Sequence, residues 1–267
     1  MLASRSFNSG MCRLVLLFGL LLAPLVCLAY GQNSLAGTPG DNSRQLLRVG
    51  MIDFAPYSYL DAQGQPAGLY LPLLTRIVEN AGYQVDFRIL PIARLAQGLQ
   101  DGTVHVWPGI EGKTELIEHT WTSRHILGYL SINLYYHADT PPPIWPDDLL
   151  GQSLIMLSGY DYWPSLMATI NDPSNHIAVK RTHSHSGAIG MLERDRARYL
   201  LNYHAPMQQA LRQRPDLDLR HRTLQWVPLR MIISRQSSMG SQSLLDKLDE
   251  SYQQLADQGA ELMLPAF

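Results

Sequence analysis

Side chains able to hold a ligand follow a predicted buried strand at the start of the fold. The apolar run Leu46–Ile52 has the length of a strand, and it is followed by Asp53, Phe54 and Tyr57. In open α/β sheets, ligands bind beyond the carboxyl ends of the strands. A carboxylate beside two rings can receive hydrogen bonds from a solute and offer it a flat surface. These residues predict a ligand site, with simple core packing of the two rings as the alternative.

A second group of rings lies at a predicted helix start. Tyr160, Asp161, Tyr162 and Trp163 are consecutive, and Asp161 is placed where an N-cap would be. The rings form a stacking surface that suits an aromatic, heterocyclic or cationic ligand. Asp161 therefore has two interpretations, a helix cap and a ligand contact.

A cation stands at the start of another predicted helix. Arg94 lies in the first turn of Ile92–Leu99, and a positive charge at that end opposes the helix dipole. This position indicates a carboxylate of a ligand or partner. An exposed arginine beside a local acid is the alternative.

The histidine pattern is a weak metal signal. His183 and His185 would share a face if they lay on a strand, with His176 nearby. Their Ser and Thr neighbours favour an exposed loop, and no acid or Cys lies at local ligand spacing. We therefore expect no metal and no cofactor.

Two units with the same order of elements must position these side chains. In the first, strands alternate with helices as Leu46–Ile52, Leu69–Val78, Gln84–Leu90, Ile92–Leu99 and Val104–Trp107. In the second, they alternate as Ser153–Leu157, Tyr162–Ile170, Ile177–Lys180, Gly187–Arg194 and Tyr199–Leu201. Such alternation predicts an α/β fold with mostly parallel strands and helices on both faces.

Two extended runs connect the units. Leu130–Tyr136 leads out of the first unit, and Leu224–Ile233 can carry the chain back, so that the two crossings form a hinge. The amphipathic segment Leu244–Leu255 would then pack on the first unit. The predicted division is a first lobe over 46–130, a second lobe with the hinge strands over 131–228, and a return segment over 229–267.

The N-terminal segment has the layout of a secretory signal peptide. Residues 1–31 combine Arg5 and Arg13 with an apolar core and small residues near a cleavage site. Residues 32–45 read as a flexible polar leader. Both cysteines, Cys12 and Cys27, fall in the segment expected to be removed, and cleavage after Ala29 or Gly31 is favoured over a lipid anchor at Cys27.

The rest of the composition favours a small soluble partner. No later stretch approaches the about 20 uninterrupted apolar residues of a transmembrane helix. With 21 Lys and Arg against 23 Asp and Glu, the formal net charge is −2. This balance gives no reason to expect binding to nucleic acid or to an anionic membrane surface.

The order of several motifs resembles the extracytoplasmic solute-binding proteins of family 3, the receptors that feed ABC importers. The motifs that carry the resemblance are Pro56-Tyr57-Ser58-Tyr59, Gly68-Leu69-Tyr70, Leu95–Gly102, Trp121-Thr122, Asp148–Gln152, Ser158-Gly159 and Leu229–Ser234. The resemblance covers nearly all of the chain after the leader. It implies a periplasmic binding protein type II fold, in which two α/β lobes joined by two hinge strands close over a solute.

The resemblance also implies a set of site residues. Phe54 and Tyr57 would form an aromatic wall, and Gly109 and Ile110 would offer backbone groups at the rim of the first lobe. From the second lobe, a helix N-terminus would face the cleft with residues Ser158, Gly159, Tyr160 and Asp161. Its N–H groups suit an anionic group of the solute.

Two expected charged anchors are replaced in this chain. Receptors for α-amino acids usually carry an Arg where this chain has Lys113, and an Asp where it has Asn202 and Tyr203. These departures argue against a standard α-amino acid. The positive charge would come from Lys113 or Arg94. The negative charge would come from Asp53, Glu111 or Asp161.

The resemblance implies a periplasmic, monomeric and non-enzymatic receptor. It would capture a small polar solute, amino-acid-like or related, and present it to an ABC transporter permease formed by a separate chain. Two alternatives stay open. One is a sensor that reports a solute to a membrane signalling protein, and the other is a dehydratase-like enzyme with Glu111 or Glu115 in acid–base roles.

Overall fold

The computed structural model describes residues 44–160 and 162–265. The predicted signal peptide, most of the leader, both cysteines and Asp161 lie outside the described residues. None of the six helices in the described part has the length and apolar character needed to cross a membrane.

One mixed sheet organises the described chain, with strand order β4-β1-β5-β10-β6-β9-β7-β8. Its strands are β1 (Leu46–Met51), β4 (Gln84–Ile89), β5 (Val106–Gly109), β6 (Thr120–His137), β7 (Ser153–Leu157), β8 (Ala178–Thr182), β9 (Tyr199–Tyr203) and β10 (Leu219–Ser234). A small hairpin joins β2 (Tyr59–Leu60) to β3 (Pro66–Ala67). The helices are α1 (Tyr70–Asn80), α2 (Ile92–Asp101), α3 (Pro164–Asn171), α4 (His185–Glu193), α5 (His204–Leu211) and α6 (Ser241–Asp257).

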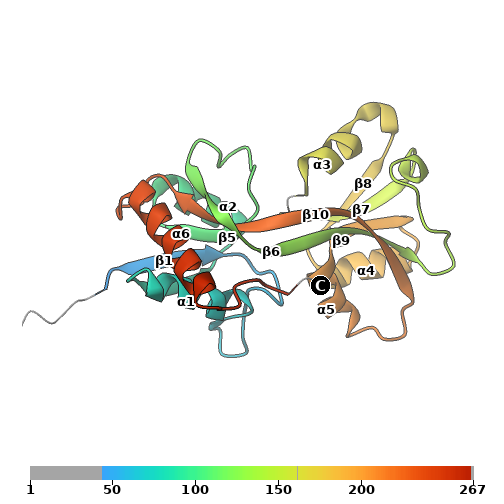
Figure 1. Ribbon diagram of the computed structural model, residues 1–267. Helices are drawn as coiled ribbons and strands as arrows, with labels where there is room; N and C mark the ends of the chain where they lie inside the picture. Colours follow the sequence, from blue (N-terminus) through green and yellow to red (C-terminus); the bar gives the residue numbers. More distant parts are fainter. Residues whose placement is uncertain (1–43, 161, 266–267) are drawn as a thin grey trace, which may run out of the picture. The chain divides into compact units, whose positions relative to one another are not determined.

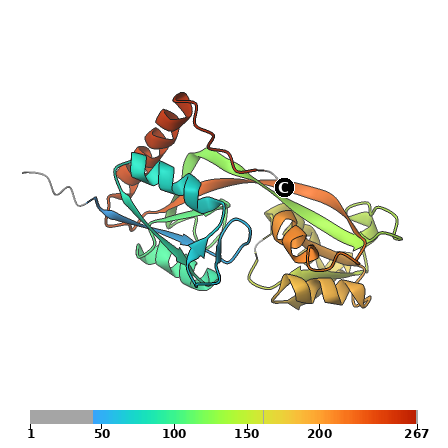
Figure 2. The same cartoon turned by 90° about the horizontal axis from the view of Figure 1, so that it is seen from below.

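The strands divide between two α/β lobes. In the first, β1 pairs in parallel with β4 and β5, and α1, α2 and α6 pack nearby. In the second, β7 pairs in parallel with β8 and β9 beside α4 and α5, with α3 following β7. The long strands β6 and β10 run antiparallel from one lobe to the other (Figures 1 and 2). This arrangement confirms the predicted α/β class with two connecting strands.

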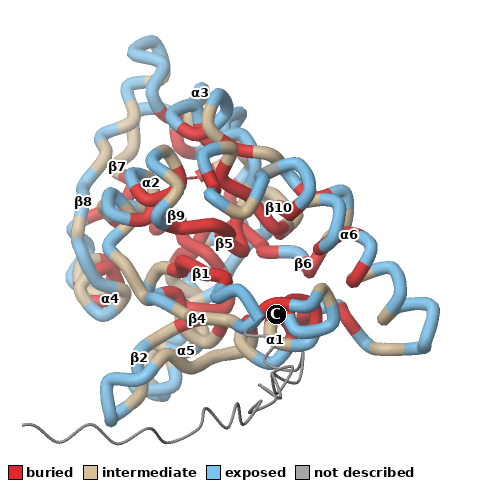
Figure 3. The backbone as a smooth tube through the Cα atoms, turned by 90° about the vertical axis from the view of Figure 1, so that its left-hand side faces the viewer, coloured by how far each residue is buried: buried red, intermediate tan, exposed pale blue. Residues whose placement is uncertain are grey.

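The central strands carry the core. Figure 3 shows buried backbone along β1, β5 and β9, with the exposed segments on the helices and loops around them. The side chains of Leu47, Val49 and Met51, at alternate positions of β1, are fully buried. Burial of such apolar surface is the main favourable contribution to folding.

Several element boundaries differ from the sequence predictions. The connecting strands extend well beyond Leu130–Tyr136 and Leu224–Ile233, because their polar outer parts still pair through the backbone. Strand β9 continues to Tyr203, so Asn202 and Tyr203 lie within the strand and not after it, held by pairing with β6. Helix α5, which directly follows β9, was not anticipated.

The helix after β7 also begins later than predicted. Helix α3 starts at Pro164, with Trp163 as its cap residue and no side-chain cap bond. Proline suits the first helical position because its missing N–H would have no partner there. The helix therefore begins after Ser158, Gly159 and Tyr160, and the predicted helix N-terminus at these residues is wrong.

We expect Gly102→Ala to cost more stability than a matched glycine replacement. Gly102 ends α2 with φ of 81°, and an added Cβ would meet the Gln236 carbonyl oxygen. Gly82 has φ of 89° with open space around it. The strained backbone alone should cost about 1 kcal/mol in Gly82→Ala. The added backbone collision should bring Gly102→Ala to about 2 kcal/mol. Urea unfolding of both variants measures the difference, and equal losses would contradict the close approach of the Gln236 carbonyl to Gly102.

Candidate functional site

A central hollow lies where the carboxyl ends of β1 and β5 meet the second lobe. Phe54, Tyr70 and Trp107 line it from the first lobe, and Tyr160 and Tyr203 line it from the second. Its cavity volume is only about 50 Å³. The hollow is therefore narrow, and a solute needs side-chain or lobe movement to enter.

Aromatic rings bridge the two lobes at this hollow. Phe54 is stacked on Tyr57 at a centroid distance of 5.7 Å, and Tyr57 on Tyr70 at 5.4 Å. Phe54 also meets the edges of Tyr160 at 5.6 Å and Tyr203 at 5.3 Å. Such pairs stabilise by about 0.5–1.5 kcal/mol beyond their burial. We call Phe54, Tyr160 and Tyr203 the aromatic bridge, because their contacts cross from one lobe to the other.

Lys113 brings a positive charge to the central hollow. It follows β5, is only 9% exposed, and its Nζ lies 5.3 Å from the centroid of the Trp107 ring. Cation–π contacts of this kind strengthen when the cation is removed from water. Lys113 also borders a second hollow, which adds Glu111 from the first lobe and Trp163 from the second. The two hollows therefore adjoin at Lys113.

Tyr160 lines both the central hollow and a third, more polar one. Asp53 borders this third hollow from the first lobe, and His183, His185 and Gln209 border it from the second. The third hollow has a volume of about 420 Å³, far more than the central one. The third hollow therefore offers a solute polar partners close to Tyr160.

A buried hydrogen-bonded chain stands behind Tyr160. The phenol oxygen lies 2.9 Å from Nε2 of His185, and Nδ1 of His185 lies 3.0 Å from Nδ2 of the fully buried Asn202. Burial raises the pKa of the Tyr160 phenol and lowers the pKa of His185 to about 4. Both groups are therefore neutral near pH 7.

We expect acid to destabilise the protein in part through His185. Burial lowers its pKa from 6.5 to about 4. Below pH 6.5 the His185 side chain binds a proton in the unfolded chain, whereas in the folded chain it binds one only below about pH 4. The free energy of unfolding therefore falls as the pH falls from 6.5 to about 4. We expect His185→Gln to abolish about 2 kcal/mol of the loss between pH 7 and pH 4. Urea unfolding across this range tests it, and identical pH profiles for variant and wild type would contradict it.

A second histidine cluster lies away from these hollows. Nδ1 of His204 is 2.8 Å from Nδ2 of Asn133 and 3.0 Å from the Tyr135 hydroxyl, and the His221 ring centroid is 4.6 Å from that of His204. Burial lowers the pKa of both histidines. The residues come from α5, β6 and β10, so no local sequence signal could have found this cluster.

The structure brings most of the predicted site residues to the three hollows. Those that line one of them are Asp53, Phe54, Gly109, Ile110, Glu111, Lys113, Gly159, Tyr160 and Tyr203. Tyr57 is buried behind Phe54, and Asn202 is buried behind His185. Ser158 lines none of the three and donates its backbone N–H to Thr182. Arg94 is exposed on α2 and lines none of them either.

Sequence reasoning missed other residues that border the hollows. Trp107 was interpreted as core, and it does pack in a core cluster, yet it also lines the central hollow. Its position two residues before Gly109 was the available signal. His185 was interpreted only as a metal candidate, and its role behind Tyr160 depends on a contact across 25 residues. Gln209 lies on the unanticipated α5.

Two α/β lobes joined by two long antiparallel strands, with a hollow lined from both lobes, are the arrangement of a type II binding-protein fold. The family model described as bacterial extracellular solute-binding proteins, family 3, matches residues 47–261. The chain therefore belongs to this family. A comparison with curated protein sequences found no match.

Solved structures share the fold at low sequence identity. The chain is similar to an ancestral arginine-binding protein bound to arginine, with 19% identity, a TM-score of 0.66, and 81% of this chain and 95% of that chain covered. It is similar to a histidine kinase sensor domain with similarity to periplasmic binding proteins, with 20% identity and a TM-score of 0.66, and 81% of this chain and 92% of that chain are covered. It is also similar to an ancestral amino acid-binding protein, a precursor of cyclohexadienyl dehydratase, with 16% identity and a TM-score of 0.62, and 80% of this chain and 90% of that chain are covered. These likenesses support the type II binding-protein fold.

Proposed function

We propose that this protein captures a small polar solute between its lobes in the periplasm and presents it to an ABC importer. The permease would be a separate chain, and the receptor would act as a monomer without catalysing a reaction. The observation that carries the proposal is the cleft, which side chains from both lobes line together. A solute held there would contact both lobes and favour the closed arrangement.

The connecting strands support a closing motion. Strands β6 and β10 are the continuous links between lobes, and their pairing is interrupted by register shifts between Leu229 and Arg230 and between Arg230 and Ile232. Gly128 on β6, paired with Leu229, has φ of 159°. Irregularities of this kind let paired strands bend.

A screen for solutes by thermal shift tests the proposal. The chain from residue 32 onward would be heated with amino acids, amines, organic acids and polar aromatic compounds. A solute present at 100 times its Kd stabilises the native state by about 2.7 kcal/mol. We expect one class of compound to raise Tm while remaining chemically unchanged. Failure of all classes to bind would contradict solute capture.

We expect Lys113→Met to weaken solute binding at least tenfold. Lys113 is the one charged side chain among the described residues that line the central hollow. Lys247, on α6, lies 5.5 Å from the centroid of the Tyr83 ring, a distance similar to that between Lys113 and Trp107. Loss of a charged hydrogen-bonding partner costs about 1.5–3 kcal/mol, which corresponds to tenfold or more in affinity. Lys247→Met is the matched control, and titration calorimetry compares the two. Unchanged affinity in Lys113→Met would remove this residue from the site.

Two alternatives to a receptor for an importer are each supported by one of the similar structures. The similarity to a kinase sensor domain supports a sensor that reports the solute to a membrane signalling protein. The similarity to the dehydratase precursor supports an enzyme, with the exposed Glu111 or Glu115 as the candidate acid–base group. NMR of the bound compound distinguishes the enzyme from the two binding roles, because only an enzyme would consume the compound. Co-purification with a permease or with a membrane kinase then distinguishes importer from sensor.

A further inference from the structure

We propose that the segment after α6 is a strap that ties the connecting strand β6 to the first lobe and limits bending of the hinge. The strap consists of residues 260–265. It contacts the first lobe and β6, so its effect on the hinge is measurable without a solute. Only its effect on solute affinity rests on the proposed function.

The end of α6 directs the chain toward the hinge. The N–H of Gly259 donates to the Ala256 carbonyl at 2.9 Å, and the N–H of Ala260 donates to the Leu255 carbonyl at 3.0 Å. These two bonds form the Schellman motif, in which Gly259 adopts its φ of 79° at little cost. The helix therefore stops here, and the chain that follows runs toward the connecting strands (Figure 2).

Alternate side chains of the strap are buried. Leu262 is 4% exposed and Leu264 is 6% exposed, whereas Glu261 and Met263 are exposed. An extended segment with this alternation has one face against the protein and the other toward solvent. Nη1 of Arg76, on α1, lies 3.5 Å from the Glu261 carbonyl oxygen, and both residues border the same surface hollow. The strap is therefore packed against the first lobe.

The strap reaches β6 at a β-bulge. On β6, Gly128 and Ile126 pair with consecutive residues of β10, so Leu127 between them is an extra residue. A bulged residue lacks a partner in the ladder of strand pairs. Leu127 is fully buried, and its carbonyl accepts a hydrogen bond of 2.7 Å from the N–H of Leu264. The strap thus supplies the partner that a buried carbonyl requires.

Gly128 makes room for the strap beside the bulge. A Cβ added at this position would lie 2.9 Å from the Cβ of Leu264. Relief of this collision would need backbone movement, because a Cβ is attached directly to the main chain. Glycine inside a strand often marks such a close approach of another segment. Gly128 and Leu264 therefore fit together as a pair.

The strap extends the part of β6 that is fixed to the first lobe. Helix α6 already holds the start of the strand, since Asp249 accepts a hydrogen bond from Ser123 and the Tyr252 hydroxyl donates to the Ile126 carbonyl at 3.2 Å. The strap adds the bulge, and the residue after Gly128 is 39% exposed. Bulges are points at which paired strands bend. With the strap in place, bending is directed to the residues beyond the bulge, and release of the strap should free the bulge to flex.

Hydrogen exchange measured by mass spectrometry tests the strap. We expect Leu264→Ala to speed exchange of the amides in residues 126–130 about tenfold, because it removes the side chain that seats the strap. Met263→Ala changes the neighbouring, 50% exposed side chain and should leave exchange unchanged. Peptides from α4, in the second lobe, report any global loosening. Equal acceleration in α4 and at the bulge, or none at the bulge, would overturn the inference.

A double-mutant cycle tests the fit of Gly128 against Leu264. Gly128→Ala should also speed exchange at the bulge about tenfold, because the new Cβ displaces the strap. Leu264→Gly removes the atom that this Cβ would strike. We therefore expect Gly128→Ala to have no further effect in the Leu264→Gly background. Multiplying effects in the double variant would show that Gly128 serves the strand itself and would overturn the role of the strap.

The spread of distances between the lobes tests the effect on the hinge. Spin labels at Glu250→Cys on α6 and Ala168→Cys on α3 occupy exposed positions, and the chain from residue 32 onward contains no other cysteine. Double electron–electron resonance is measured without solute in the Phe54→Ala background, which lacks the aromatic bridge. We expect Leu264→Ala to widen the distance distribution and Met263→Ala to leave it unchanged. An unchanged width in both would show that pairing of β6 with β10 alone limits the hinge, against the inference.

The strap should also affect solute capture. A looser hinge loses more conformational entropy when the lobes close, so Leu264→Ala should weaken binding of the solute found by the screen about threefold. Titration calorimetry with Met263→Ala as control measures this change. Equal affinity of Leu264→Ala and wild type would overturn the link between strap and capture. If no compound of any class binds, the proposed function fails, and hydrogen exchange still decides whether the strap exists.

Discussion

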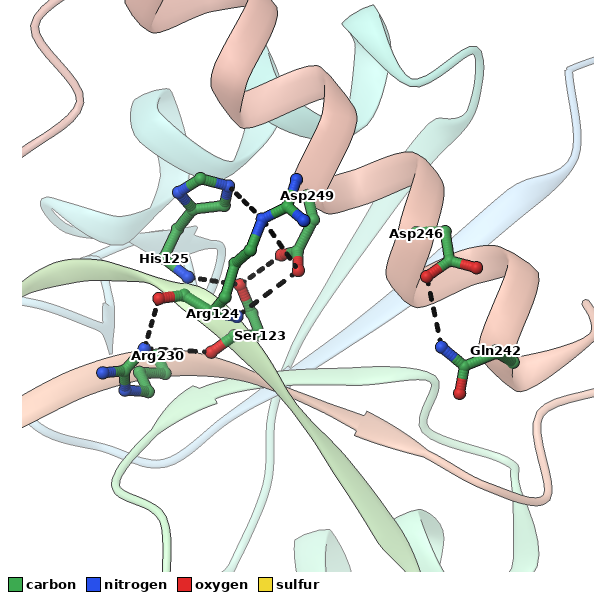
Figure 4. A network of polar contacts seen from close by, with 7 residues as sticks. All are labelled: Ser123, Arg124, His125, Arg230, Gln242, Asp246 and Asp249. Atoms are coloured by element: carbon green, nitrogen blue, oxygen red, sulfur yellow. Dashed lines mark hydrogen bonds and ion pairs between the residues drawn. The ribbon is translucent and has the colours of Figure 1, made fainter.

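Asp249→Ala should lower the free energy of unfolding by about 3 kcal/mol. This is the usual cost of removing a buried charged group together with its hydrogen bonds. Asp249 lies on α6, is 6% exposed, and receives a hydrogen bond of 2.5 Å from the Ser123 hydroxyl and one of 3.3 Å from the Arg124 backbone N–H. Figure 4 shows how this carboxylate joins α6 to the start of β6. Alanine would leave the Ser123 hydroxyl and the Arg124 N–H without these partners.

The same helix supplies the control for this experiment. Asp246 accepts a hydrogen bond from Gln242 one turn earlier (Figure 4), but both side chains are exposed. Asp246→Ala should change stability by less than about 0.5 kcal/mol. Urea unfolding of the two variants isolates the effect of burial. Similar small losses in both would show that Ser123 and Arg124 find water in place of Asp249.

Phe54→Ala should cost about 3 kcal/mol of stability and loosen the contact between the lobes. The Phe54 side chain is 6% exposed, and it contacts Tyr57 within the first lobe and both Tyr160 and Tyr203 in the second. Truncation removes the member of the aromatic bridge that the first lobe contributes. Without solute, small-angle X-ray scattering should therefore report a larger radius of gyration for the variant than for the wild type.

Tyr129→Ala is the control, because it removes an aromatic ring that is not part of the aromatic bridge. Tyr129 lies on the connecting strand β6, but it is 39% exposed and lines none of the three hollows. We expect a small stability change and an unchanged radius of gyration. An unchanged radius in Phe54→Ala as well would indicate that the lobes are held by β6 and β10 and not by the aromatic bridge.

The hydrophobic pattern was sufficient to predict the architecture. Alternation of strand-length apolar runs with amphipathic segments predicted two α/β units, because burial of one face imposes a period on the residues of each element. The pattern failed at the outer parts of β6 and β10, where polar residues such as Thr223 pair through their backbones alone. It also missed α5, which begins directly after β9 without an intervening turn.

The site was predictable to the extent that it depends on strand ends. Phe54 follows β1, and Gly109 ends β5, so their nearness at the central hollow follows from the parallel pairing of these strands. Asp53, also after β1, borders the third hollow. Arg94 was selected by charge alone, and the structure leaves it exposed on α2. Charge marks a candidate, but only the direction of the side chain decides whether it reaches the cleft.

What the sequence by itself determined is the family, the two α/β lobes and the strand ends that border the cleft. Only the tertiary structure decided that Asn202 and His185 stand behind Tyr160, and that Phe54 meets rings of the other lobe. The physical reason is the range of the interactions. Periodicity and turn chemistry act between near neighbours, whereas these contacts join residues distant in sequence and depend on how strands and lobes pack.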